Sequence, residues 1–255
     1  MSVKVREVID ALEHFAPLPL QESYDNAGLQ CGLTETEVSG ALLCLDVTED
    51  VLREAVDLGC NMIVAHHPLL FRALKCVSDA TDVERCLRLA IQNDIAIYAA
   101  HTNLDNAEDG VNYMIAEKLG LIDLVPMQGG GVLGYLPVEE QAEFFLERVK
   151  ETFRCSCLMH NEMLSRPIGS VAICGGAGDF AIDEAVRQEA DAFLTGEMHY
   201  HRYFGYDDKI QIAVLGHYES EQYTIELLQR VLEERLPELS LYMTEINTNP
   251  IKYLI

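Results

Sequence analysis

The segment MIVAHHP, residues 62–68, places two adjacent histidines, His66 and His67, directly after four apolar residues. Adjacent side chains on a regular strand point to opposite faces, so both imidazoles can serve one site only where the strand has ended. Pro68 cannot continue a strand ladder and marks that end. The segment therefore predicts a buried strand that delivers a pair of imidazoles to its carboxyl end.

Apolar segments of the same kind lie on either side of this strand in the sequence. Residues 40–47 and 95–100 are predicted to form buried strands, and helices capped by Thr48 and Thr81 are expected between the strands. A further helix is expected over residues 108–119. This alternation of helices with nearly continuous apolar strands is typical of an α/β fold with a parallel sheet covered on both faces.

Three consecutive glycines at residues 129–131 are the best candidate for a linker between domains. The chain after them carries its own strands and helices, and a strand at 211–215 then leads into a helix expected over 217–235. Because His217 and Glu221 have to reach His66, we expect the C-terminal part to return to the first domain. The expected organisation is two α/β domains with mainly parallel sheets flanked by helices: a metal-binding domain of residues 1–126 and 208–255, and an inserted domain of residues 127–207.

Two further pairs of potential ligands, His101 with Asp105 and His217 with Glu221, are each four residues apart and follow predicted strands. In open α/β sheets, ligands bind at the carboxyl ends of the strands. A single histidine at a strand end is usually a hydrogen-bonded structural residue, but the coincidence at three strand ends favours a metal site. Mixed nitrogen and oxygen ligands suit zinc, iron or manganese better than calcium or magnesium. The ligands suffice for two ions. Glu221 is the candidate bridging carboxylate, and His101 either binds metal or orients Asp105.

Two other segments follow predicted strands. Residues 174–178, CGGAG, could cradle a phosphate with their backbone amides, but they lack the full dinucleotide fingerprint and the P-loop lysine, which favours a tight turn. Residues 195–201, TGEMHYH, contribute Glu197 and His201, which either lie over the metal site or are structural polar residues.

Composition restricts the partners. The 42 acidic residues against 18 basic residues give a net charge of −24, which repels a phosphate backbone and makes nucleic acid a poor partner. Eight scattered cysteines are typical of buried thiols in a reducing compartment, so we expect a cytoplasmic protein. No segment approaches the roughly 20 apolar residues that span a bilayer, so no membrane is expected.

Five segments resemble, in order, the motifs of the GTP cyclohydrolase 1 type 2 family, also called the Nif-three-like family: YDNAGLQCG (24–32), AHHPLLFRALK (65–75), HTNLDNAEDGVN (101–112), DAFLTGEMHYH (191–201) and GHYESE (216–221). The resemblance implies a dinuclear divalent-metal site with the ligands His66, His67, Asp105, His217 and Glu221. It also implies two α/β domains, the second inserted, assembled as a toroidal homohexamer with the metal sites facing an internal cavity. The chain departs from the family pattern at Tyr24, where Trp is usual, and at His199, where Lys is common.

The resemblance implies a metal-dependent hydrolase acting on a small molecule, by this analogy a nucleotide. Hydroxide generated at two divalent ions, zinc, iron or manganese, would attack C8 of the guanine of GTP, and the ring would open with release of formate. The candidate catalytic residues for proton transfer are Glu197, His101 and His201.

Two other functions use the same ligands. One is a metal-handling or regulatory protein without catalysis, in which the coordination of the ions is closed; the other is a two-metal phosphoesterase, which differs in the atom attacked. A triphosphate requires several cations, and Arg72, Lys75 and Arg202 are the basic residues near the ligand loops.

Overall fold

The computed structural model describes residues 2–254, which belong to two compact units. The first unit comprises Met1–Ala107 and Thr224–Pro250, and the second comprises Glu108–Tyr223 and Ile251–Ile255. Each unit has its own sheet and helices, so the expected α/β class with two domains is confirmed. Within residues 2–254, none of the helices combines the length and the apolar composition needed to cross a bilayer.

The first unit contains a five-stranded sheet in the order β1-β4-β3-β2-β11. Its strands are β1 (Gly28–Cys31), β2 (Ala41–Cys44), β3 (Met62–Ala65), β4 (Ala96–Ala99) and β11 (Leu241–Met243). Pairing is parallel throughout except between β1 and β4. Every residue of β2, β3 and β4 is buried, as the continuous apolar runs predict for a sheet covered on both faces.

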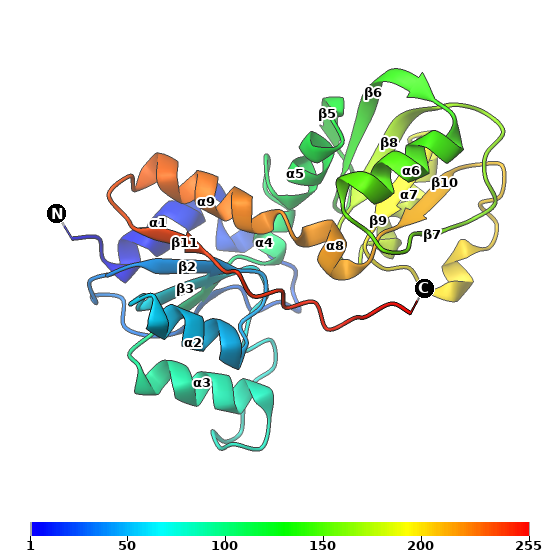
Figure 1. Ribbon diagram of the computed structural model, residues 1–255. Helices are drawn as coiled ribbons and strands as arrows, with labels where there is room; N and C mark the ends of the chain where they lie inside the picture. Colours follow the sequence, from blue (N-terminus) through cyan, green and yellow to red (C-terminus); the bar gives the residue numbers. More distant parts are fainter. Residues whose placement is uncertain (1, 255) are drawn as a thin grey trace. The chain divides into compact units, whose positions relative to one another are not determined.

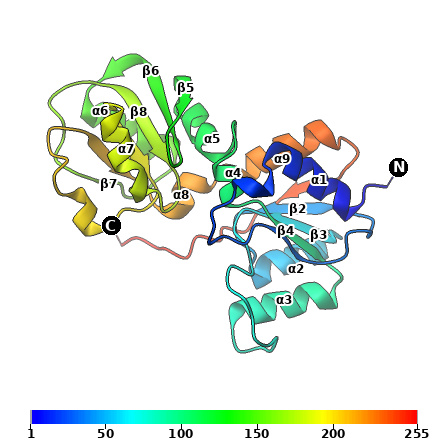
Figure 2. The same cartoon turned by 180° about the vertical axis from the view of Figure 1, so that it is seen from behind.

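Helices cover both faces of this sheet. They are α1 (Val5–Phe15), α2 (Glu49–Asp57), α3 (Asp82–Gln92), α4 (Thr102–Asp105) and α9 (Thr224–Arg235), together with the 3₁₀ helix η1 (Leu18–Leu20). Figure 1 shows α1 and α9 on one face and α2 and α3 on the other, and Figure 2 shows the same arrangement from behind. The expected caps are confirmed, because Thr48 accepts a hydrogen bond from the Val51 amide and Thr81 accepts one from the Glu84 amide.

The second unit contains a six-stranded mixed sheet in the order β5-β6-β8-β9-β10-β7. Its strands are β5 (Ile122–Pro126), β6 (Val132–Glu140), β7 (Met159–His160), β8 (Ile168–Cys174), β9 (Ala192–Thr195) and β10 (Gln211–Val214). The three strands β8, β9 and β10 are parallel, and antiparallel strands flank them on both sides. The parallel core is the part of this sheet that positions potential ligands.

The second unit has its own helices. They are α5 (Val111–Lys118), α6 (Ala142–Thr152), α7 (Ile182–Arg187) and α8 (His217–Glu221), with the 3₁₀ helices η2 (Asp179–Ala181) and η3 (Tyr200–Tyr203). Buried residues of α7, including Ile182 and Ala185, join Phe193 of β9 and Ile212 of β10 in one apolar cluster. This cluster anchors α7 on the parallel part of the sheet.

The structure differs from the expected domain boundaries in two places. The glycines at 129–131 form a turn between the antiparallel strands β5 and β6 rather than a linker between domains. In this turn the Met127 amide donates to the Gly131 carbonyl at 3.0 Å. The strand expected at 211–215 is β10, which pairs with β9 and β7 and therefore belongs to the second sheet. The single helix expected over 217–235 is divided into α8, in the second unit, and α9, in the first.

Candidate metal centre

The register of the first sheet brings the ends of its central strands level. Cys44 pairs with Ala65, and Ala65 pairs with Ala99, so β2, β3 and β4 end at the same edge. His66 follows β3 directly, and His101 lies two residues after the end of β4. The histidines predicted from two separate segments therefore meet at the carboxyl edge of one parallel sheet.

Three imidazoles form a compact cluster at this edge. The ring centroids of His66 and His67 are 4.9 Å apart, and that of His101 lies 5.3 Å from the first and 5.4 Å from the second. One ring nitrogen from each lies within 4.8 Å of those of the other two, which is close enough for all three to bind the same metal centre. The backbone ends its strand at Ala65, as two adjacent histidines serving one site require.

Each of these three rings holds its Nδ1 atom against an oxygen. His66 Nδ1 lies 2.7 Å from the Ala100 carbonyl, His67 Nδ1 lies 2.8 Å from Asp46 Oδ1, and His101 Nδ1 lies 2.7 Å from Asp25 Oδ1. A carbonyl and an ionised carboxylate only accept hydrogen bonds, so each Nδ1 carries the hydrogen in the neutral form of the ring. The lone pair is then on Nε2, which is the arrangement of histidines that bind metal ions.

Asp105 supplies a carboxylate to the same group. Its Oδ1 atom lies 3.6 Å from His66 Nε2, at the last residue of the short helix α4. Two ligands that are each about 2.1 Å from one ion lie roughly 3–4 Å apart, so this separation suits a shared ion. Imidazole nitrogens with a carboxylate oxygen fit zinc, iron or manganese, as the sequence predicts.

The carboxylates behind the histidines are strongly acidic. Burial of Asp25, whose side chain is 0 % exposed, opposes its ionisation, but hydrogen bonds from His101 and Thr102 outweigh burial and hold its pKa at about 2. Burial also opposes ionisation of Asp46, while hydrogen bonds from His67 and Thr248 lower its pKa. Both groups are therefore anionic acceptors at neutral pH.

The second sheet has an equivalent edge. Cys174 pairs with Thr195, and Thr195 pairs with Val214, so β8, β9 and β10 end level with one another. His217 begins α8 just beyond β10, and its Nδ1 atom lies 2.9 Å from Glu197 Oε1, two residues beyond β9. This is a fourth histidine whose Nδ1 faces an oxygen.

His217 and Glu221 lie one turn apart on α8, as their spacing predicts. The distance between His217 Nε2 and Glu221 Oε2 is 3.2 Å, and the Glu221 side chain is 5 % exposed. A β-carbon at Gly176 would overlap the Glu221 carboxylate and lie 3.5 Å from His217 Cε1. The second unit therefore holds an imidazole and a carboxylate at one point, packed against a glycine.

The glycine-rich segment 174–178 forms a tight turn. The Gly175 amide donates to Asn112 Oδ1 at 2.9 Å, and the Gly176 amide donates to Ser220 Oγ at 3.0 Å. Side chains thus occupy two of the amides that a phosphate cradle would need. The contacts favour the tight-turn interpretation, with the turn supporting α8.

The remaining residues of the TGEMHYH segment have different surroundings. His201 is exposed on η3, where its ring contacts those of Tyr200 and Phe204, with centroid distances of 5.2 and 6.3 Å. His199 Nδ1 lies 2.7 Å from Asp179 Oδ2, which gives this exposed histidine a structural partner. Arg202 donates to the Asp179 carbonyl at 2.9 Å.

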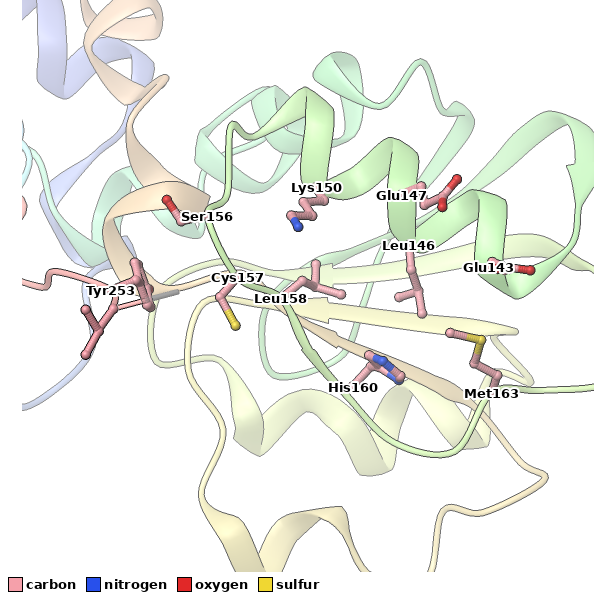
Figure 3. Close-up of a pocket in the computed structure, with 11 residues that line it drawn as sticks. Glu143, Leu146, Glu147, Lys150, Ser156, Cys157, Leu158, His160, Met163 and Tyr253 are labelled. Carbon is pink, nitrogen blue, oxygen red and sulfur yellow. The ribbon is translucent and has the colours of Figure 1, made fainter.

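A pocket of about 490 Å³ in the second unit has no predicted site residue in its lining. Figure 3 shows Lys150, Glu147 and Glu143 of α6 above it, with Cys157 and His160 below. Its mixture of acidic, thiol and apolar groups differs from the histidine-rich edges. We therefore place the candidate site at the strand ends.

Asp25 and Asp46 are not among the site residues predicted from the sequence. Asp46 follows the buried strand β2 by two residues, which is the same signal that identified His101 after β4. Asp25 is separated from His101 by 76 residues, and its position within the segment 24–32 was the available signal. Polar residues just after an apolar strand therefore include hydrogen-bond partners of the candidate ligands as well as the candidate ligands themselves.

Comparison with known proteins identifies similar chains. Over residues 3–250 the chain matches the family model described as Duf34/NIF3 (NGG1p interacting factor 3). A protein of Clostridium acetobutylicum named GTP cyclohydrolase 1 type 2 homolog is 31% identical, covering 99% of this chain and 100% of the relative. A protein of Lactococcus lactis with the same name is 31% identical, covering 97% and 98%. The crystal structure of Staphylococcus aureus hypothetical protein SA1388 matches with a TM-score of 0.92 at 26% identity, covering 100% of both chains.

Proposed function

Because the chain belongs to the Duf34/NIF3 family, we propose that it is a metal-dependent hydrolase that uses two divalent ions. The observation that carries the proposal is the cluster of His66, His67 and His101, in which each ring has Nδ1 bound to an oxygen and one ring nitrogen of each lies within 4.8 Å of those of the other two. When bound, divalent ions at such a site would lower the pKa of a bound water molecule and would polarise a carbonyl or phosphoryl oxygen of a substrate.

The proposed ligands are His66, His67, Asp105, His217 and Glu221, with Glu221 as the bridging carboxylate. Two observations support this set. His66 and Asp105 have their potential ligand atoms 3.6 Å apart in the first unit, and His217 and Glu221 have theirs 3.2 Å apart in the second. We add His101 as a further ligand, because Asp25 fixes its ring through Nδ1 and one of its ring nitrogens lies within 4.8 Å of a ring nitrogen of His66 and of His67.

The proposed reaction consumes two water molecules, of which the first opens the five-membered ring of the guanine of GTP at C8 and the second hydrolyses the resulting formamide with release of formate. The name GTP cyclohydrolase 1 type 2 homolog of the relatives supports this substrate class. Glu197 is the proposed proton acceptor, because its side chain is 54% exposed while one oxygen faces His217. His201 is exposed and is proposed to exchange protons with solvent. With a net charge of −24, the protein needs the ions as well as Arg72 and Lys75 to attract a triphosphate.

The first prediction concerns His66. We expect metal-loaded protein to release formate from GTP, and we expect His66→Ala to lower the rate by at least about 100-fold, because it removes an imidazole ligand. Formate release and metal content are measured on the same samples. The exposed His14, on α1, provides the control variant His14→Ala, which should keep the wild-type rate of formate release and the wild-type metal content. Full-rate formate release by metal-free protein would refute the proposal.

The same preparation tests the two alternative functions. A panel of phosphoesters distinguishes a phosphoesterase, because such an enzyme releases phosphate rather than formate. His66→Ala should lower the rate of this release as well. Protein that binds its ions tightly but turns over neither GTP nor any phosphoester would instead be a metal-handling protein. The proposed hydrolysis of GTP fails in both cases.

A further inference from the structure

We propose that Asp25 and Asp46 are positioning residues that fix the orientation and the protonated nitrogen of His101 and His67, so that both rings present Nε2 to metal. This inference rests on the proposed metal-binding function. It gives a role to the segment 24–32, which contributes no metal ligand in the proposed function. It also predicts that substitution of either aspartate weakens metal binding without removing a ligand.

Asp25 holds the loop that carries His101. Asp25 Oδ1 accepts a hydrogen bond from His101 Nδ1 at 2.7 Å, and Asp25 Oδ2 accepts one from the Thr102 amide at 3.1 Å and another from the Thr102 hydroxyl. The Asp25 side chain is fully buried and accepts hydrogen bonds from the two consecutive residues His101 and Thr102. The ring of His101 is therefore fixed relative to its own backbone.

Asp46 holds His67 in the same way from a different strand end. Asp46 Oδ1 lies 2.8 Å from His67 Nδ1, and Asp46 Oδ2 accepts a hydrogen bond from Thr248 Oγ1 at 2.5 Å. One oxygen is thus occupied by a distant residue, which leaves the other directed at the ring. His66 differs, because its Nδ1 atom faces the backbone carbonyl of Ala100, which no side-chain substitution removes.

The segment 24–32 also holds the loop that follows His67. Asn26 Nδ2 donates to the Leu70 carbonyl at 2.7 Å, and the Leu70 amide donates to Gln30 Oε1 at 3.1 Å. The Asn26 amide in turn donates to Asp25 Oδ1 at 2.7 Å. The two loops that carry the three clustered histidines are therefore attached to one short segment.

The chemistry of neutral imidazole explains why these contacts matter. A neutral ring has one N–H group, and an anionic acceptor at Nδ1 holds the proton there and leaves the lone pair on Nε2. Without the acceptor, the ring can rotate and the proton can move to Nε2, which removes the ligand atom. Substitution of such partners typically lowers metal affinity 10- to 100-fold.

The experiment compares Asp25→Ala and Asp46→Ala with a matched control. Asp179→Ala removes a carboxylate that lies 2.7 Å from Nδ1 of His199, which is the same type of pair outside both ligand groups. Competition with a chromogenic chelator measures the affinity for Zn²⁺. We expect about 10- to 100-fold weaker binding in the two test variants and unchanged binding in the control.

Nitrogen NMR of the metal-free proteins gives a second measurement that does not depend on metal. In the wild type, His67 and His101 should carry their proton on Nδ1, and the matching ring should become a mixture of both forms in each alanine variant. Asp46→Asn keeps an oxygen acceptor for His67 and a donor for Thr248, so it should retain the wild-type form. If Asp25→Ala does not fold, as judged by circular dichroism, the Asp46 variants still test the inference.

The outcomes separate the two proposals. Folded alanine variants that bind Zn²⁺ as tightly as the wild type, or that keep Nδ1 protonated, would overturn the positioning role while the metal site stands. A wild-type protein that binds none of Zn²⁺, Mn²⁺ and Fe²⁺ would instead overturn the proposed function. In that case, the NMR measurement alone would report what the carboxylates do to the rings.

Discussion

Gly176 shows how a residue without a side chain shapes the candidate site. Its φ angle of +57° is in the left-handed region, and a β-carbon there would meet the Glu221 carboxylate. The carboxylate is the mobile end of a long side chain, so it would move before the backbone did. The absence of a side chain at Gly176 therefore sets where the Glu221 oxygens lie.

We predict that Gly176→Ala weakens metal binding in addition to lowering the free energy of unfolding. The backbone strain should cost about 1–2 kcal/mol of unfolding free energy, and the displaced carboxylate should weaken metal binding in addition. Gly205→Ala is the matched control, because Gly205 has a φ of +88° in the same unit but no atom within 4 Å of the added carbon. Urea unfolding and chelator competition give the two quantities. Equal metal affinities for the two variants would contradict the prediction.

Whether a site residue can be predicted from the sequence depends on whether it follows an apolar strand. His66, His101 and His217 follow such strands, and their positions at strand ends were predicted correctly. Asp25 lies before β1, in a loop whose contacts with His101 and Leu70 span 76 and 44 residues. No local periodicity encodes contacts of this kind, because they arise only when the tertiary fold forms.

The segment that follows η3 is attached to α7 by a hydrogen bond from the phenol of Tyr206. Tyr206 donates to Asp183 Oδ1 at 2.5 Å, and Arg202 approaches the other oxygen of Asp183 at 3.4 Å. Burial and the Asp183 carboxylate raise the pKa of Tyr206 to about 12, against a smaller opposite effect of Arg202. The protonated phenol is thus stabilised by folding.

We predict that the stabilisation that this hydrogen bond provides is lost in alkaline solution. The phenol pKa is about 10 in the unfolded chain and higher in the folded chain, so its contribution is complete below about pH 10 and declines as the pH rises toward 12. Tyr206→Phe should be less stable than the wild type at about pH 9, and the difference should shrink by about pH 11. Urea unfolding at both pH values measures this, with the exposed Tyr200→Phe as control. A difference that is constant with pH would rule the mechanism out.

The elements that the sequence assigned incorrectly share a physical cause. Residues 211–214 are as apolar as the strands of the first sheet, so hydrophobic pattern identifies the strand but not its sheet. The glycines at 129–131 have positive φ angles, which suit a turn between antiparallel strands as well as a linker. Strand pairing decides both questions, and pairing is not a local property of the sequence.

At the scale of the whole molecule, we predict self-association as a homohexamer. The edge strand β5 exposes Ile122 by 48% and Val125 by 49%, although the chain carries a net charge of −24. Sedimentation should give about six times the chain mass of 28.5 kDa. We expect Val125→Lys to reduce this mass, whereas Val77→Lys, at an equally exposed site in the first unit, should not. A wild-type protein that sediments as a single chain would show the prediction to be wrong.

The hydrogen bond between Asp46 and Thr248 has a consequence for how the protein is made. The two residues are 202 positions apart, so the ribosome adds Thr248 long after the histidine loops have emerged. Strand β11, at the edge of the first sheet, also follows the histidine loops in the chain. The nascent chain therefore contains His67 and Asp46 before Thr248 is present to hold the Asp46 carboxylate. We expect tight ion capture by His67 to wait until Thr248 has been synthesised and holds the Asp46 carboxylate.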